Sequence, residues 1–514
     1  MKVVIGNAWP YANGSLHIGR VSSWIGGDIL ARYHRLKGDE VIFVSGSDCH
    51  GAPILNKAKE LKKRPEDLIN KYHEEFIKCF KALGFSFDIF SRTDSLYHEN
   101  QVKEIIKGLY DKGFIYEKET EEFYCENCLD TLDEFGVKDG FCKECNSKVE
   151  VKSSNNLFFK LSYFQEYIKG ILGKEESWRE NAIKITKRYL EGGLRDKILT
   201  REIDWGIEVP IEGFSDKRVY VWIDALLAYV TSSKKIIEER GQVLEDYWNN
   251  EESRIYLVHG KENIPFHSTM FPAMLSGMGL EKSKIRIFSS QYLTLEGKTF
   301  STNRNWAIWV PYILKRYNVD SIRYYLISRG AEDKNSDFTW RDFIKANNSE
   351  LAGSLGNLYY RILNFILKNF NGEIRGEEVP LQWSNLIRRT YASVGNKFEN
   401  GEFKSGLEEI FSLINQGNDF FDKNKPWVLI NKDRKRCKEV LYILVQIIAS
   451  LIDLLNPVLP YTSYKIRKGL CIEKTKWGFS EVNNVRVNKV EFLFDKIDKK
   501  VAIEEFNRLK SRKI

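Results

Sequence analysis

The chain has 514 residues and a formal net charge of +8, from 79 basic and 71 acidic side chains. A chain of this length is expected to form about three domains and needs no disulfide bonds to stabilise its core. A hydrophobic content of 43% and a charged content of 29% argue against a disordered or fibrous chain. The positive charge permits a nucleic-acid partner but does not require one, because a slight surface excess of lysine gives the same value.

Nothing in the sequence predicts secretion or membrane insertion. The apolar run before Pro10 is too short for a signal peptide. The longest apolar stretch, 440–455, is interrupted by Gln446 and Asp453, so we interpret it as a buried helix of a bundle. We therefore expect a cytoplasmic protein whose cysteines stay reduced.

The first part of the chain alternates strands and helices. Residues 3–5 and 41–44 are short apolar runs typical of buried strands, and a helix pattern begins near Leu16. The same pattern resumes at 218–222 and 255–258, which we also predict to be strands. This order indicates a parallel α/β sheet, which binds ligands beyond the carboxyl ends of its strands.

The loop after the first strand has the composition of a phosphate-binding site. Gly14 and Gly19 allow close approach of the backbone, and Ser15 is a candidate N-cap. His17 and Arg20, three residues apart, are predicted to share one helix face. The string Trp-Pro-Tyr-Ala-Asn-Gly-Ser-Leu-His-Ile-Gly-Arg resembles the His-Ile-Gly-His signature of the class I aminoacyl-tRNA synthetases. The residues Pro-Tyr-Ala-Asn-Gly, which precede the signature, resemble those of the methionine enzymes. The string departs from the signature at Arg20, which cannot titrate near neutral pH.

Three further segments extend the resemblance to an amino-acid pocket. They are 47–53, 220–229 and 259–267. Aromatic rings suit a polarisable thioether, and a carboxylate suits a substrate ammonium group. Trp9 stands where a smaller aliphatic residue is expected, so the shape of the pocket is expected to differ. The resemblance implies that methionine is bound by Ala8, Trp9, Tyr11, Asp48, Trp222, Tyr229, Phe266 and His267, with Asp48 holding the ammonium group.

A second loop, 296–304, matches the Lys-Met-Ser-Lys-Ser signature only in part. When Ser301 is aligned with the central serine, threonines replace both lysines. Lys298 and Arg304 flank the loop and would supply positive charge for pyrophosphate. The alternative is a loop that has lost its catalytic role. The resemblance implies catalytic roles for His17, Arg20, Lys298, Ser301 and Arg304, and ATP contacts from Tyr11, Asn13, Gly14, His17, Gly19, Arg20, Gly260 and Lys261.

Four cysteines have the spacing of a closed metal site. Two pairs, each separated by two residues, bring four thiolates together as a tetrahedral zinc ion requires. We predict one structural zinc ion bound by Cys125, Cys128, Cys142 and Cys145; a redox role is the alternative.

The chain from 346 onward is predicted to be almost continuously helical, with polar breaks at 371–372 and 424–426. In the methionine family, the residues matching Asn357, Arg361 and Trp427 read the tRNA anticodon. Their chemistry suits unstacked bases, although a packing role for Trp427 is an equal alternative.

The resemblance implies an α/β fold: a Rossmann-type parallel-sheet catalytic domain, split by a zinc-binding connective insert and followed by an all-α anticodon-binding bundle. We expect the catalytic halves at 1–112 and 201–285, the insert at 113–200, a signature-loop and stem-contact region at 286–345, and the helical domain at 346–514. The insert is too small for the editing domain of the isoleucine, valine and leucine enzymes.

The implied function is ATP-dependent ligation of L-methionine to tRNA(Met) through methionyl-adenylate, with Mg²⁺ accompanying ATP. A monomer without an appended tRNA-binding or dimerisation domain is expected. Two alternatives stay open: a paralogue that activates methionine for another acceptor, and a non-catalytic RNA-binding or regulatory protein.

Overall fold

The computed structural model describes residues 1–128, 130–132, 136–143, 145–174, 178–376, 378–473 and 475–511. The chain forms two compact units. Unit 1 comprises 1–15, 42–78 and 87–289, and unit 2 comprises 16–41, 79–86 and 290–514. Within the described residues, no helix combines the length and the apolar character needed to cross a bilayer.

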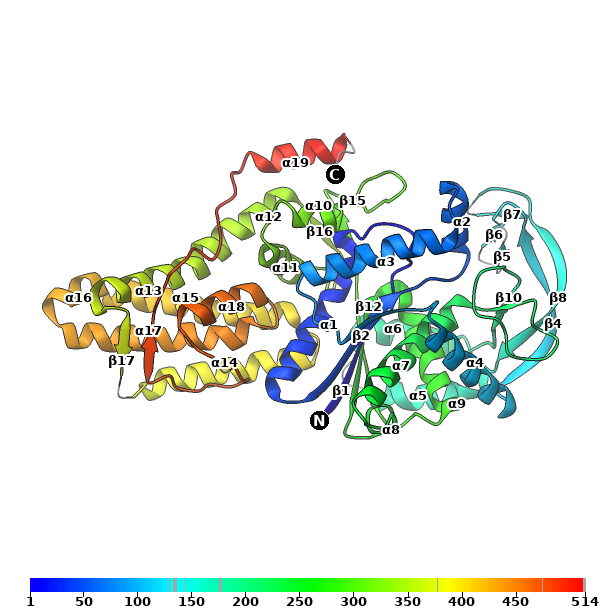
Figure 1. Cartoon of the computed structure of the whole chain (residues 1–514), viewed down its shortest axis with the longest axis horizontal. Coiled ribbons are helices and arrows are strands. Elements are labelled where there is room, and N and C mark those ends of the chain that lie inside the picture. Colours follow the sequence, from blue (N-terminus) through cyan, green and yellow to red (C-terminus); the bar gives the residue numbers. More distant parts are fainter. Residues whose placement is uncertain are drawn as a thin grey trace. The chain divides into compact units, whose positions relative to one another are not determined.

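The centre of unit 1 is a five-stranded sheet in the order β13-β12-β1-β2-β3. Figure 1 labels three of its strands, β1, β2 and β12. Two of its pairings are parallel, β1 with β12 and β2 with β3. The predicted runs 3–5, 41–44 and 255–258 lie within three of these strands, because apolar residues on both faces suit a sheet covered by helices. The strands are β1 (Lys2–Asn7), β2 (Glu40–Ser47), β3 (Ile89–Arg92), β12 (Arg254–Gly260) and β13 (Lys284–Ser290).

The prediction of a strand at 218–222 is wrong for most of its length. Only β11 (Arg218–Val219) is extended, and it pairs antiparallel with β10 (Thr200–Arg201) outside the central sheet. Helix α7 (Val221–Glu239) begins directly after it. A short apolar run does not distinguish a buried strand from the first turn of a buried helix.

Helices and short helical segments surround the central sheet of unit 1. They are α2 (Ala52–Leu61), α3 (Pro65–Ala82), α4 (Leu96–Asp111), η1 (Leu161–Phe164), α5 (Gln165–Lys174), α6 (Glu180–Glu191), α7, α8 (Glu245–Trp248), η2 (Lys261–Asn263), the π-helical η3 (Phe266–Met270) and α9 (Phe271–Met278). The last residues of α3 belong to unit 2.

The insert contains an antiparallel sheet that its sequence pattern did not predict. Its strand order is β5-β4-β8-β9, and the long β4 and β8 pair over ten residues of register. The strands are β4 (Ile115–Cys125), β5 (Asp130–Leu132), β8 (Glu150–Phe159) and β9 (Lys197–Ile198), with a separate small pair β6 (Val137–Lys138) and β7 (Phe141–Cys142). Their polar and charged side chains mask the alternation that usually reveals a strand.

Unit 2 is mainly helical, as predicted from residue 346 onward. Both polar breaks end helices, since Asn371 and Lys425 adopt positive φ angles after α13 and α15. Its helical elements are α1 (Ile18–Lys37), α10 (Val310–Leu314), α11 (Val319–Ser328), α12 (Trp340–Ala346), the π-helical η4 (Asn347–Gly356), α13 (Asn357–Phe370), α14 (Leu381–Glu399), α15 (Phe403–Asn424), α16 (Pro426–Lys432), α17 (Arg434–Leu455), α18 (Pro460–Gly469) and α19 (Val501–Lys510). Its strands are β14 (Leu293–Leu295), β15 (Lys298–Thr299), β16 (Ser336–Phe338), β17 (Glu373–Arg375) and β18 (Asn484–Arg486). The predicted apolar helix at 440–455 is the buried part of α17.

A fully buried arginine joins distant parts of unit 2. Arg323 on α11 donates to the carboxylate of Asp28 on α1 at 2.8 Å and to the backbone oxygen of Leu83 at 3.1 Å. It also donates to the backbone oxygens of Pro457 and Val458, which follow α17. Because its partners satisfy the guanidinium, a charge can be accommodated without contact with water.

Candidate active site and RNA-binding residues

The side chains predicted to bind methionine gather within unit 1. Trp9 follows β1, and its ring lies edge-on to that of Tyr229 on α7, with centroids 6.4 Å apart. Trp222, in the first turn of α7, stacks on Phe266 at 4.2 Å with nearly parallel planes. Phe266 and His267 are the first two residues of the π-helix η3, and the His267 ring lies 5.6 Å from the Tyr229 ring. The sequence prediction therefore identified side chains that come together in space.

Glycines in the sheet make room for two of these rings, Tyr229 and Trp9. A Cβ on Gly6 of β1 would lie 2.5 Å from the Tyr229 ring. A Cβ on Gly46 of β2 would lie 2.0 Å from the ring of Trp9. The unexpected Trp9 thus fits against β2 because Gly46, which lies next to its ring, has no side chain.

The hydrogen bonds of His267 fix the proton positions in this pocket. Its Nδ1 lies 2.9 Å from the backbone oxygen of Asn263, which can only accept, so Nδ1 carries the proton. Nε2 then accepts from the Tyr229 hydroxyl at 3.0 Å. Burial lowers the pKa of His267 to about 4 and raises the pKa of Tyr229, so both side chains are neutral. The pocket presents polar groups without net charge, as a thioether requires.

Asp48 lies at the end of β2 and is 3% exposed. Its backbone accepts from the N–H of Ala12 and donates to the oxygen of Pro10, which ties it to the segment after β1. Burial and the nearby Asp224 raise the pKa of the Asp48 carboxyl well above its usual value. A cation brought by a ligand would restore the ionised carboxylate.

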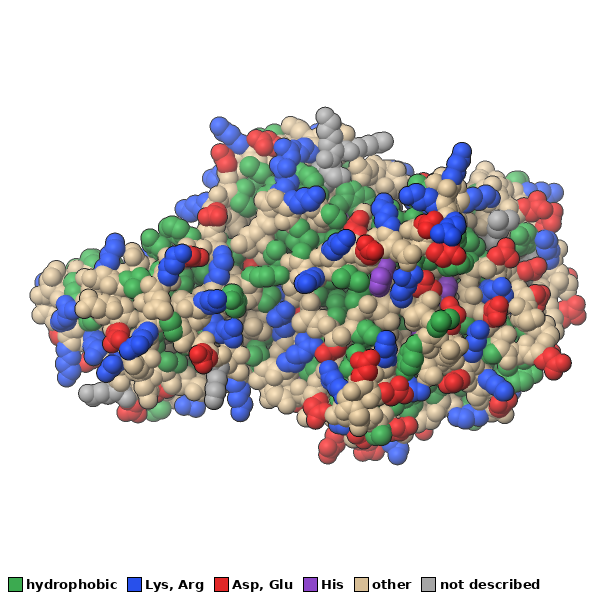
Figure 2. All heavy atoms as spheres, viewed as in Figure 1, with side chains coloured by type: hydrophobic (Ala, Val, Ile, Leu, Met, Phe, Trp, Pro, Cys, Tyr) green, Lys and Arg blue, Asp and Glu red, His purple; other side chains and the backbone are tan. Residues whose placement is uncertain are grey.

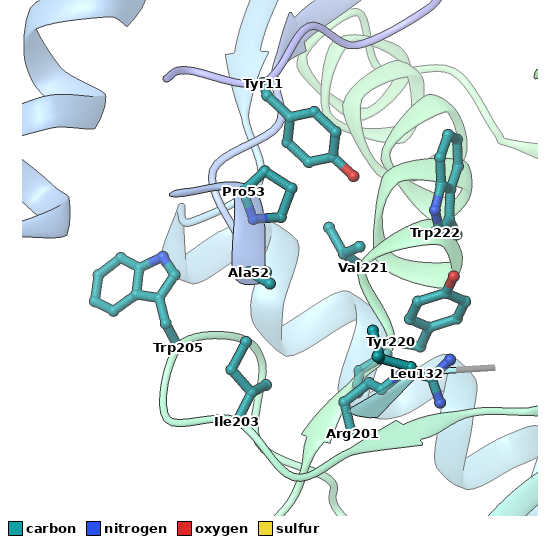
Figure 3. Close-up of a pocket in the computed structure, with 12 residues that line it drawn as sticks. Tyr11, Ala52, Pro53, Leu132, Arg201, Ile203, Trp205, Tyr220, Val221 and Trp222 are labelled. Atoms are coloured by element: carbon teal, nitrogen blue, oxygen red, sulfur yellow. The ribbon is translucent and has the colours of Figure 1, made fainter. Parts of the chain in front are cut away.

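A cavity of about 240 Å³ opens beside these residues (Figure 3). Its lining includes Tyr11, Pro53, Trp205 and Trp222. Arg201 also lines it, with its guanidinium 4.2 Å from the centre of the Tyr220 ring. Arg201 and Trp205 lie outside the segments that carry the resemblance, so nothing in the sequence predicted them as site residues.

The remaining ATP-binding candidates of unit 1 lie in loops at strand ends. Asn13 donates to the backbone oxygen of Pro53 at 3.3 Å, and Gly14 has open space where a Cβ would be. Gly260 ends β12, and Lys261 begins the short helix η2. These positions agree with the carboxyl ends of parallel strands, where α/β proteins bind ligands. Ala8 also lies there, directly after β1, and is buried.

The phosphate-loop prediction needs two corrections at the start of α1. His17, not Ser15, occupies the N-cap position, and its backbone is extended and pairs with Trp309. His17 therefore lies outside the helix that holds Gly19 and Arg20, and does not share a helix face with Arg20. The N–H of Ile18 donates to the oxygen of Ile308, and the N–H of Val310 donates to the oxygen of Leu16. This pairing holds His17 extended, so the helix begins only at Ile18.

His17 is enclosed by the second signature loop. Its imidazole stacks on Phe300, with centroids 4.9 Å apart, and its buried Nδ1 has no hydrogen-bond partner among the described residues. Burial and the charge of Arg20 lower the pKa of His17 to about 3. It is therefore a neutral donor or acceptor at physiological pH.

The second signature loop is a tight hairpin. Glu296 and Gly297 both have positive φ angles, and the backbone N–H of Gly297 donates to Asp337. Lys298 and Arg304 are exposed, and the Lys298 ammonium lies 4.8 Å from the centre of the Trp306 ring. Ser301 pairs with Trp306 through the backbone and accepts from the N–H of Arg304 at 3.4 Å. Two cations thus flank a turn that Ser301 shapes.

The four cysteines converge as predicted. Their Sγ atoms all lie within 4.8 Å of one another, with Cys125 and Cys145 at 3.4 Å and Cys128 and Cys142 at 3.8 Å. Four sulfurs at about 2.3 Å from a tetrahedral zinc ion would be separated by similar distances. The donor set therefore fits a closed metal site.

The three anticodon candidates lie in the helical part of unit 2. Arg361 on α13 sits 4.5 Å from the Phe421 ring and 5.9 Å from the Trp427 ring, and pairs with Asp422 at 2.6 Å. Trp427, at the start of α16, is 45% exposed, so much of its ring is available for stacking. Asn357 is the first residue of α13 and lies one helical turn before Arg361. On the face that Figure 2 shows, Lys and Arg side chains are spread over this helical part, with Asp and Glu side chains among them.

Comparison with known proteins identifies the family. The model of a family described as tRNA synthetases class I (M) matches residues 3–138 and 125–363. The chain belongs to this family of class I tRNA synthetases. A second model, the anticodon binding domain of methionyl tRNA ligase, matches residues 373–508.

Individual relatives agree with this assignment. Methionine–tRNA ligase 1 of Alkaliphilus oremlandii is 44% identical, over 99% of this chain and all of the relative. Methionine–tRNA ligase of Bacillus cereus is 40% identical, over 99% of both chains. The methionyl-tRNA synthetase of Mycobacterium tuberculosis, solved with methionyl-adenylate, has a TM-score of 0.85 at 24% identity, covering 96% of this chain and 100% of that one. The last comparison supports the fold alone.

Proposed function

We propose that this enzyme ligates L-methionine to tRNA(Met) through a methionyl-adenylate. The observation that carries this proposal is the pocket of unit 1, where aromatic rings and the neutral Tyr229–His267 pair lie near the unpaired carboxylate of Asp48. The printed names of the two relatives at 40% and 44% identity support the same substrate and acceptor.

Asp48 holds the ammonium group of methionine, and the rings enclose its thioether. The substrate side chain is bound by Ala8, Trp9, Tyr11, Trp222, Tyr229, Phe266 and His267. A methionine carboxylate oxygen attacks the α-phosphorus of ATP, the bond from that phosphorus to the bridging oxygen breaks, and pyrophosphate leaves. A ribose hydroxyl of the terminal tRNA adenosine then attacks the methionyl carbonyl, and AMP leaves. No protein nucleophile is needed, so catalysis consists of positioning and charge stabilisation.

Charge stabilisation is assigned to His17, Arg20, Lys298, Ser301 and Arg304. The buried, unpartnered Nδ1 of His17 supports its role, since a phosphate group would supply the missing hydrogen bond. The ATP contacts are assigned to Tyr11, Asn13, Gly14, His17, Gly19, Arg20, Gly260 and Lys261, with Mg²⁺ offsetting the charge of the phosphates.

The anticodon is assigned to Asn357, Arg361 and Trp427. The exposed Trp427 ring and the neighbouring guanidinium offer a stacking surface, and Asn357 offers amide hydrogen bonds. A zinc ion is assigned to Cys125, Cys128, Cys142 and Cys145, where it would hold the small strands of the insert together. We further propose that the enzyme is cytoplasmic and monomeric.

Methionine-dependent exchange between ATP and pyrophosphate tests the first step, with leucine and isoleucine as controls. Exchange with methionine alone is the expected result. Its absence in folded, zinc-loaded protein would exclude adenylation and favour the RNA-binding alternative. Exchange without charging of tRNA would instead identify a paralogue that serves another acceptor.

A further inference from the structure

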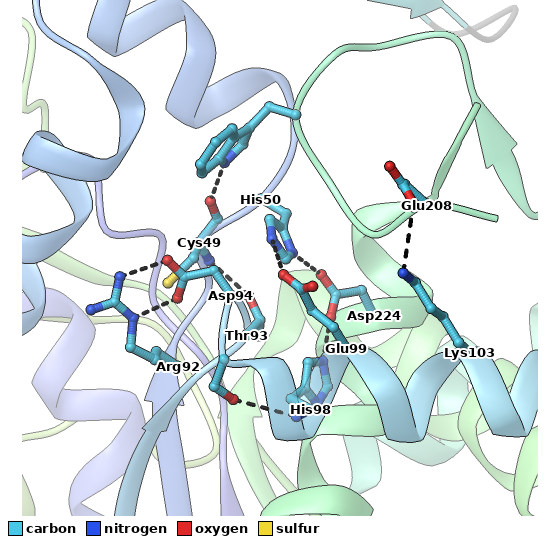
Figure 4. A network of polar contacts seen from close by, with 12 residues as sticks. Cys49, His50, Arg92, Thr93, Asp94, His98, Glu99, Lys103, Glu208 and Asp224 are labelled. Atoms are coloured by element: carbon cyan, nitrogen blue, oxygen red, sulfur yellow. Dashed lines mark hydrogen bonds and ion pairs between the residues drawn. The ribbon is translucent and has the colours of Figure 1, made fainter. Parts of the chain in front are cut away.

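A buried chain of polar side chains joins the loop that follows Asp48 to helices α4 and α7 (Figure 4). Asp224, in the first turn of α7, is 1% exposed. One of its oxygens lies 2.7 Å from Nδ1 of His50, in the loop after β2. The other lies 2.6 Å from Nε2 of His98, in the first turn of α4. The chain ends at Thr231, whose hydroxyl lies 2.7 Å from Nδ1 of His98.

These contacts make Asp224 an ionised and paired carboxylate. Burial alone would raise the pKa of Asp224, but the charge and hydrogen bonds of His50 and His98 lower it below its usual value. Burial opposes the charge of His50 too, yet Asp224, assisted by Asp94 and Glu99, raises its pKa above the usual value. His50 and Asp224 are therefore an ion pair removed from water.

Asp48, two residues before His50, is in the opposite state. Its carboxylate accepts one long hydrogen bond, from the backbone N–H of His50 at 3.4 Å. Among the described residues, no Lys, Arg or His side chain forms an ion pair with it. Two buried carboxylates thus stand close together, one with its counter-charge and one without.

We propose that His50, Asp224 and His98 are positioning residues for the ammonium group of the substrate. His50 and His98 neutralise the buried carboxylate of Asp224, and the imidazolium of His50 pairs with that carboxylate instead of with Asp48. Asp48 is then the carboxylate that remains to bind the incoming ammonium group. Without the charge of Asp224, His50 would keep only its longer ion pair with Glu99, at 4.0 Å, and its imidazolium would compete with the substrate for Asp48. The inference deepens the proposed function and rests on it, because the ammonium group belongs to the proposed substrate.

The backbone of the loop has separate support. Trp205 donates from its indole to the backbone oxygen of Cys49 at 2.7 Å, and Thr93 accepts from the N–H of Cys49 at 2.9 Å. These bonds do not involve the side chains of the positioning residues. We therefore expect the loop to keep its path when the ion pair is removed.

The test compares two ligands that differ only in the amine. Methioninol carries the thioether and the ammonium group, and 4-(methylthio)butan-1-ol lacks the ammonium. Their dissociation constants are measured by calorimetry for the wild type, Asp224→Asn and His50→Ala. Asp246→Asn is the matched control, because Asp246 is partly exposed and pairs with Lys2 at the start of β1, whereas the pocket residues Ala8 and Trp9 follow the end of that strand.

We expect both variants to lose about tenfold or more of their affinity for methioninol, as for removal of a charged hydrogen-bonding group, while binding of 4-(methylthio)butan-1-ol stays unchanged. Asp246→Asn should match the wild type for both ligands. An equal loss for both ligands, or no loss for either, would overturn the proposal. Thr231→Val, which removes only the far end of the chain, should show a smaller loss with the same dependence on the amine.

Failure of the proposed function would look different. Wild-type protein that gives no exchange and does not bind methioninol has no methionine site, whatever the variants do. Wild-type protein that prefers methioninol over its amine-free analogue, with variants that keep this preference, would refute the positioning role alone. Asp48→Asn measured in parallel should abolish the preference.

Discussion

The imidazole of His17 and the ring of Phe300 are stacked at 4.9 Å, with an angle of 15° between their planes. This contact joins the two signature segments of unit 2. Phe300 aligns with neither lysine of the Lys-Met-Ser-Lys-Ser signature. Gly19 permits the contact, since a Cβ there would lie 2.9 Å from the Phe300 ring.

Replacing Phe300 by alanine should weaken ATP binding and slow pyrophosphate exchange. An aromatic pair contributes about 0.5–1.5 kcal/mol, so we expect a rise of up to about tenfold in the KM for ATP. The KM for methionine should not change, because its pocket lies in unit 1. Phe300→Met keeps an apolar contact and serves as the control. Equal changes in both KM values would contradict a role limited to the phosphate loop.

Acid should destabilise the wild type more than His17→Asn. The folded protein holds the pKa of His17 at about 3, whereas an unfolded chain protonates near pH 6.5. The stability gained from neutral His17 is thus present above about pH 6.5 and lost as the pH falls toward about 3, at up to about 1.4 kcal/mol per pH unit. Urea unfolding between about pH 7 and 5 should show a shallower loss for the variant. If the free energy of unfolding fell equally with pH in the wild type and the variant, the lowered pKa of His17 would be contradicted.

Cys142→Ser should remove the metal. Three thiolates and a hydroxyl bind zinc more weakly than four thiolates, so elemental analysis should find less than one zinc per chain. The matched control is Cys471→Ser, because Cys471 is exposed and far along the chain from the cluster. Full zinc content in Cys142→Ser would show that the site does not need all four sulfurs. Equal losses in both variants would point to a non-specific effect.

Trp427→Ala and Arg361→Ala should impair tRNA charging but not amino-acid activation. Loss of one stacked base costs about 1–3 kcal/mol, so the KM for tRNA should rise about tenfold or more. Pyrophosphate exchange should be unchanged. Arg436→Ala is the control, since Arg436 is an exposed arginine paired with Glu439 on α17. A packing role for Trp427 would instead lower thermal stability and leave the KM for tRNA unaffected.

Trp9→Leu should change the inhibition by methionine analogues. Trp9 fills the space above Gly46 and meets the edge of the Tyr229 ring, so a smaller side chain would enlarge the pocket. Analogues with a longer side chain should bind more tightly to the variant, as inhibition of exchange would show. Equal inhibition constants for the wild type and Trp9→Leu would contradict the idea that Trp9 limits the size of the pocket.

The sequence predicted the elements whose pattern is local. The runs at 3–5 and 41–44 are apolar on both faces, and 440–455 is a long helical stretch, so burial and secondary structure agree with composition. The cysteine cluster was predictable from spacing alone, because four thiolates at that spacing have few other uses.

Features that depend on distant pairing were not predictable. His98 lies in α4, outside every motif of the sequence, and only the fold brings its side chain to Asp224. His50 and Asp224 lay within segments selected for other reasons, and nothing in their spacing indicated an ion pair. The misplaced N-cap at Ser15 has the same origin, because the strand-like pairing of His17 with Trp309 joins residues far apart in the chain.

The buried Arg323 has a consequence for synthesis of the protein on the ribosome. Its partners come from the first hundred residues, at Asp28 and Leu83, and from Pro457 and Val458 near the end. Until the last of these leaves the exit tunnel, a guanidinium in the middle of the chain lacks half of its acceptors. Unit 2 therefore completes its fold only after nearly the whole chain has been translated, and a fragment beginning at residue 346 would lack the arginine that binds the end of α17.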